Sequence, residues 1–92
     1  MHKIVWARPA LEDLVSAGEY IAQENPAAAR RMANRVQEAI EFLIDQPNIG
    51  RPGRLERTRE LVVSGTPFVV VYRLQSGVVQ VLRVLNHAQK WP

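Results

Sequence analysis

The stretch FVVVYRLQSGVVQVLRVL, residues 68–85, decides the fold. Residues 68–74 and 78–85 are rich in β-branched and aromatic side chains, and Ser76-Gly77 between them is a turn sequence. The stretch therefore predicts two antiparallel strands joined by a tight turn. Upstream, residues 59–63 (RELVV) predict a further strand, which a Gly-Thr-Pro turn separates from the next. Three strands with such short connections predict an antiparallel meander.

The first half of the chain predicts two helices. In residues 9–23, which begin with a proline, apolar side chains recur at three-and-four spacing, and Asp13 falls in the first turn. Asn25-Pro26 ends this helix and caps the next, which the same spacing carries to about Gln46. Because only about two residues join the helices, they predict an antiparallel helical hairpin.

The whole chain predicts one α+β domain. Residues 3–7 read as an N-terminal strand that joins the meander in a single sheet, and the helical hairpin covers one face of that sheet. Ninety-two residues suit one domain, so residues 1–92 are expected to form a single unit.

Charge is distributed unevenly along the chain. Residues 1–49 hold five Lys or Arg and seven Asp or Glu, whereas residues 50–92 hold seven and two. Ten of the twelve basic residues are Arg, whose planar group suits carboxylate or phosphate. A Pro- and Gly-rich loop carries Arg51, Arg54 and Arg57. The basic half predicts an anionic partner, either nucleic acid or an acidic protein segment, although a solvated basic face would look the same.

In two of the predicted strands, apolar residues occupy both odd-numbered and even-numbered positions, so both faces of each strand carry apolar side chains. A sheet covered by helices on one face should alternate more cleanly. We therefore expect the second face to expose a Val/Leu patch for a partner, which includes Val69, Val71, Val81 and Leu85. The tail that contains Trp91 either joins this surface or covers it.

Composition argues against several other classes of protein. The absence of cysteine excludes disulfides and thiolate chemistry, and His2 and His87, the only histidines, have no carboxylate cluster at metal-ligand spacing. No apolar run approaches the roughly 20 residues that span a bilayer. We expect a cytoplasmic protein with no cofactor, no metal site and no membrane contact.

One catalytic arrangement is chemically plausible, which is RNA cleavage by attack of a 2′-hydroxyl. That reaction needs an acid, a base and cations at the phosphate, but no metal. His87 is the candidate acid or base, and Arg83, Arg73 and the loop arginines are candidate phosphate ligands. The alternative is that His87 only ends a strand.

The order of the motifs resembles the RelE/ParE toxin superfamily over essentially the whole chain. Its strongest stretches are residues 58–63 (TRELVV), 66–73 (TPFVVVYR) and 81–92 (VLRVLNHAQKWP), in addition to WA at 6–7, ALEDL at 10–14, NPAAA at 25–29 and RPGR at 51–54. The resemblance implies the strand, helical hairpin and meander derived above. It also implies a cognate antitoxin that folds its C-terminal segment onto the toxin and contacts operator DNA with a separate domain.

Within this superfamily, RelE-like members cleave mRNA in the ribosomal A site, whereas ParE-like members inhibit DNA gyrase. By resemblance, Val69 stands where RelE-like nucleases carry a catalytic arginine, and the tail lacks their tyrosine. His87 does match a strand-end histidine of YoeB-like members. The resemblance is therefore closer to the ParE type and predicts a gyrase inhibitor. A metal-independent, ribosome-dependent endoribonuclease is the alternative, and a degenerate toxin that only binds its antitoxin is a third reading.

Overall fold

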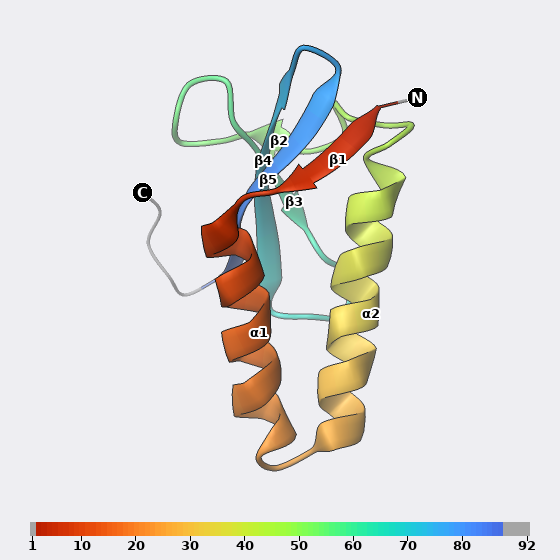
Figure 1. The fold of residues 1–92 in the computed structure, drawn as a ribbon, viewed down its shortest axis with the longest axis vertical. Helices are drawn as coiled ribbons and strands as arrows, with labels where there is room; N and C mark the ends of the chain where they lie inside the picture. Colours follow the sequence, from red (N-terminus) through yellow and green to blue (C-terminus); the bar gives the residue numbers. More distant parts are fainter. Residues whose placement is uncertain (1, 88–92) are drawn as a thin grey trace.

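A computed structural model, which describes residues 2–87, shows a two-layer α+β domain (Figure 1). Its elements are β1 (Lys3–Trp6), α1 (Arg8–Ala22), α2 (Pro26–Phe42), β2 (Arg51–Pro52), β3 (Arg59–Val62), β4 (Phe68–Gln75) and β5 (Val78–Asn86). The predicted fold class, with a strand, a helical hairpin and a meander in one sheet, is confirmed.

The sheet is mixed and has five strands in the order β1-β5-β4-β3-β2. The meander β3-β4-β5 is antiparallel as predicted, and β1 joins its edge in parallel with residues 78–81 of β5. The two-residue strand β2 lies within the predicted loop and pairs with Glu60 and Arg59 at the opposite edge. Sequence reasoning missed β2 because two residues inside a Pro- and Gly-rich segment carry no periodicity.

The two helices lie antiparallel against one face of the sheet (Figure 1). The Asn25 side chain caps α2 by accepting a hydrogen bond from the Ala28 N–H at 3.0 Å. The α2 helix ends at Phe42, four residues before the predicted end, and the chain continues in tighter turns such as Leu43 N–H to Ile40 O at 3.0 Å. Within residues 2–87, no helix is long and apolar enough to span a membrane.

The core lies between the helices and the sheet. Ala10, Val36 and Ile40 of the helices pack against alternate residues of β4 and β5. Tyr72 of β4 is fully buried in this core. Its hydroxyl donates a hydrogen bond to the Pro47 carbonyl at 2.8 Å and accepts one from the Gly50 N–H at 2.9 Å. This hydroxyl fixes the start of the loop that leads into β2.

A β-bulge in β5 explains why its apolar residues occupy both odd-numbered and even-numbered positions. Val71 pairs with Arg83 but Tyr72 pairs with Val81, which leaves Leu82 as an extra residue. Because the bulge shifts the alternation by one, Val79, Val81 and Val84 all pack in the core. Val81 was expected on the exposed face of the sheet, but it is 0% exposed and packs in the core with residues of the helices.

Candidate partner-binding pocket

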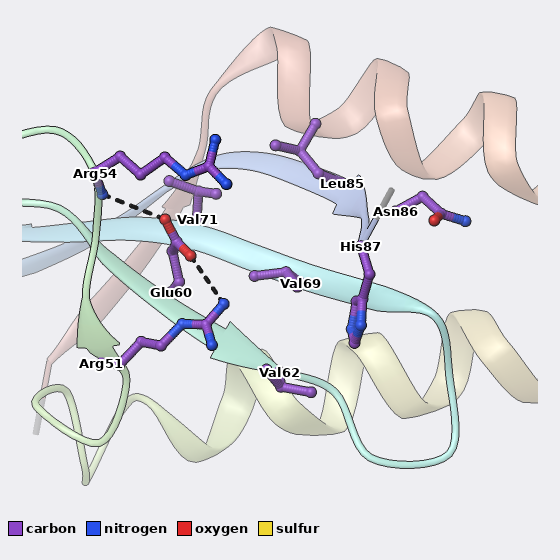
Figure 2. A pocket seen from close by; sticks show the side chains of 9 residues that line it. All are labelled: Arg51, Arg54, Glu60, Val62, Val69, Val71, Leu85, Asn86 and His87. Carbon is purple, nitrogen blue, oxygen red and sulfur yellow. Dashed lines mark hydrogen bonds and ion pairs between the residues drawn. The ribbon is translucent and has the colours of Figure 1, made fainter. Parts of the chain in front are cut away.

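A hollow of about 230 Å³ lies on the sheet face opposite the helices (Figure 2). Strands β2 to β5 all contribute to it. Its lining residues are Arg51, Arg54, Glu60, Val62, Val69, Val71, Leu85, Asn86 and His87. Six of these were predicted as site residues from the sequence: Arg51, Arg54, Val69, Val71, Leu85 and His87.

The floor of the pocket is aliphatic. Val69 and Val71 alternate along β4 with residues that face the helices, and Leu85 pairs with Val69 across the ladder. These three side chains are only 8%, 1% and 5% exposed. The expectation that these three residues form a broad exposed patch is therefore wrong. They lie instead at the bottom of a hollow that Arg51, Arg54 and Glu60 also line. Val62, at the rim, is 44% exposed.

One wall of the pocket is polar and contains an ion pair. The β2–β3 pairing places Arg51 opposite Glu60, and Arg51 Nη2 lies 3.2 Å from Glu60 Oε1. The other carboxylate oxygen of Glu60 accepts from the Arg54 backbone N–H at 3.4 Å. Glu60 was not predicted as a site residue, because only the pairing with β2 brings it to the arginine loop.

The outcome differs for two other predicted partner residues. Arg57 is exposed at a turn where its φ is 67°, and it lies outside the hollow. Trp91 lies outside the residues that the structure describes.

His87, Arg73 and Arg83, three of the residues predicted for RNA cleavage, are not brought together. His87 lines the pocket, and its backbone N–H donates to the Pro67 carbonyl at 2.9 Å. Arg73 lies farther along β4 and donates from Nε to Gln80 Oε1 at 2.7 Å. Arg83 pairs with Val71 of the pocket floor, but its guanidinium binds Asp13 of α1. Neither Arg73 nor Arg83 lines the hollow.

Asp13 is a structural residue whose role sequence reasoning missed. It lies beyond the first turn of α1, because the helix starts at Arg8. Its carboxylate accepts from Arg83 Nε at 2.7 Å and Nη2 at 2.9 Å, and from the Val84 backbone N–H at 2.9 Å. The hydrogen bond to Asp13 raises the pKa of Arg83. Since β1 pairs only as far as Val81, Asp13 satisfies an edge N–H that β1 does not reach.

Among residues 2–87, no group of three or more His, Cys, Asp or Glu side chains is placed to hold a metal ion. The pocket instead offers two arginines, one histidine and a carboxylate around an aliphatic floor. This arrangement suits an anionic group attached to an apolar body.

Comparison with known proteins places this chain in a family. Residues 4–91 match the model of the ParE toxin of the type II toxin–antitoxin system parDE. The toxin Y4kP of Sinorhizobium fredii is 40% identical over 90 residues, covering 98% of this chain and 93% of that protein. Toxin RelE2 of Caulobacter vibrioides is 38% identical over 89 residues, covering 97% and 99%.

A solved structure supports the same assignment of fold. A chain of the chromosomal ParDE toxin–antitoxin system from P. aeruginosa superposes with a TM-score of 0.85 at 24% identity, covering 94% of this chain and 96% of that chain. The family match spans nearly all of the sequence, and the two relatives are matched over almost their full length. The chain belongs to the ParE toxin family of type II toxin–antitoxin systems.

Proposed function

We propose that this toxin arrests growth in the cytoplasm by inhibiting DNA gyrase, without bond-making chemistry of its own. We further propose that a cognate antitoxin neutralises it by laying an acidic segment across the pocket of Arg51, Arg54 and His87. The antitoxin, rather than this chain, would contact operator DNA.

The observation that carries the gyrase proposal is that the strand arginines Arg73 and Arg83 do not line the pocket with His87. Cleavage of RNA needs cations at the phosphate beside the acid and base. Here Arg83 is bound to Asp13 and Arg73 to Gln80, and neither lines the pocket with His87. Val69 provides an aliphatic floor at the position where, by resemblance, a nuclease carries an arginine.

One observation favours the endoribonuclease as the second candidate. His87 shares its pocket with Arg51 and Arg54, so an acid–base group and two cations do line one hollow. Both loop arginines were among the predicted phosphate ligands, whereas the strand arginines Arg73 and Arg83 do not line the hollow. A ribosome-dependent nuclease would then use the loop part of the predicted cation set.

Expression of the toxin without antitoxin, followed by two assays, tests the proposal. Gyrase supercoiling is measured with purified protein, and mRNA from the same cells is mapped by primer extension. We expect supercoiling to be lost and mRNA to stay intact. Codon-phased mRNA cuts with normal supercoiling would contradict the gyrase proposal and support the nuclease.

Substitution at His87 gives an independent test. We expect His87→Gln to keep its toxicity, because a gyrase inhibitor needs no proton transfer there. A nuclease that loses its acid or base should instead lose activity by about 100-fold or more. His2→Gln is the matched control, because His2 lies outside the pocket and its ring contacts the Ile44 carbonyl at 3.1 Å. Circular dichroism checks that both variants fold.

A further inference from the structure

The carboxylate of Glu60 lies between the side chains of Arg51 and Arg54 in the pocket (Figure 2). Its side chain is 12% exposed, whereas that of Arg51 is 62% exposed. We propose that Glu60 occupies, in the free toxin, the place on Arg51 that a carboxylate of the antitoxin takes when the antitoxin binds. The two carboxylates therefore compete for Arg51. This inference rests on the proposed antitoxin binding and names the chemical group that the pocket receives.

The contacts of Glu60 are weak enough to exchange. Its oxygens lie 3.2 Å from Arg51 Nη2 and 3.4 Å from the Arg54 N–H, at or beyond the long end of the usual range for hydrogen bonds. Arg51 also extends into solvent, and solvent-exposed ion pairs contribute little free energy. A guanidinium has five N–H donors, so an incoming carboxylate can bind Arg51 while Glu60 is displaced or shares it.

The walls and floor together indicate an acidic protein segment rather than RNA. Arg51 and Arg54 both line the hollow, and a guanidinium group binds carboxylates with charge-assisted hydrogen bonds. The floor of Val69, Val71 and Leu85 is aliphatic, and among residues 2–87 only one aromatic side chain, that of His87, lines the hollow. Single-stranded RNA is usually held by several aromatic side chains on which successive bases stack, and one histidine offers only a single such surface. A segment with a carboxylate next to aliphatic side chains fits both features.

The direction in which Glu60→Gln changes the affinity for the antitoxin tests this inference. Glutamine can still accept from the Arg54 N–H, but it no longer competes as an anion. With the antitoxin of the same operon as the probe, we expect isothermal titration calorimetry to show binding tighter by roughly two- to fivefold. The gain should shrink as salt is added, because salt screens exposed charges. Glu56→Gln, in the same loop but outside the pocket, makes the same charge change and should leave affinity unaltered.

A second comparison uses Arg51. If Glu60 competes for Arg51, then Arg51→Gln should weaken antitoxin binding more in the Glu60→Gln background than in the wild type. Unchanged or weaker binding by Glu60→Gln would overturn the inference and make Glu60 a brace for the loop. Failure of the wild-type toxin to bind the antitoxin would instead overturn the proposed function, so the two failures are distinguishable.

Discussion

At the scale of single residues, the hydroxyl of Tyr72 links the core to the wall of the pocket. It bonds to both Pro47 and Gly50 just before β2, and a Cβ at Gly50 would lie only 2.7 Å from the same oxygen. Tyr72→Phe leaves a buried carbonyl and a buried N–H without this partner. We expect the free energy of unfolding to fall by about 2 kcal/mol, measured by urea denaturation at neutral pH.

The same hydroxyl gives a pH dependence. Burial raises the pKa of Tyr72, although the Gly50 N–H and Arg59 lower it in part. Above about pH 10 the unfolded chain therefore loses this proton before the folded chain does, and the free energy of unfolding falls as pH rises. Tyr72→Phe should lack this decline. Tyr20→Phe, which alters a side chain that is 76% exposed, should behave as wild type, and an equal alkaline loss in both variants would contradict the argument.

At the scale of elements, Asp13 joins α1 to the end of β5. Its carboxylate binds Arg83 and the Val84 N–H just past the bulge that turns Leu85 toward the pocket. Asp13→Asn removes the charge and some acceptor capacity, so we expect stability to fall by roughly 1–2 kcal/mol in urea denaturation. Hydrogen exchange at Val84 should also become faster. Glu12→Gln, at an exposed neighbouring position, is the control, and equal losses in both variants would argue against the Asp13 contacts.

Most elements of the fold could be predicted from the sequence, but some pairings between strands could not. Local periodicity and turn residues were enough for both helices and the meander, because those signals lie within each segment. The pairing of β2 with Glu60 and the bulge at Leu82 depend on neighbouring strands, so no local pattern contains them. Glu60 was therefore missed, and Val81 was assigned to the wrong face. The binding role of the six predicted pocket residues stays a prediction.

At the scale of the whole molecule, the packed core and the arginine pocket lie on opposite faces of the sheet. The helices cover one face of the sheet, and the arginine pocket opens on the other. The basic character of residues 50–92 is thus concentrated on the strands and loop, whereas α2 carries Arg30 and Arg31 on its exposed surface. If the antitoxin recognises the pocket, then the position of the charge matters more than the net charge of the chain.

Two double variants with equal changes in net charge distinguish these possibilities. Arg51→Gln with Arg54→Gln should weaken antitoxin binding by roughly tenfold or more, because both arginines line the pocket. Arg30→Gln with Arg31→Gln should change it by less than roughly twofold, since salt screens distant exposed charges. Glutamine is chosen over glutamate because it places no like charge beside Glu60. Calorimetric titration measures both affinities, and equal losses would mean that net charge, rather than the pocket, attracts the antitoxin.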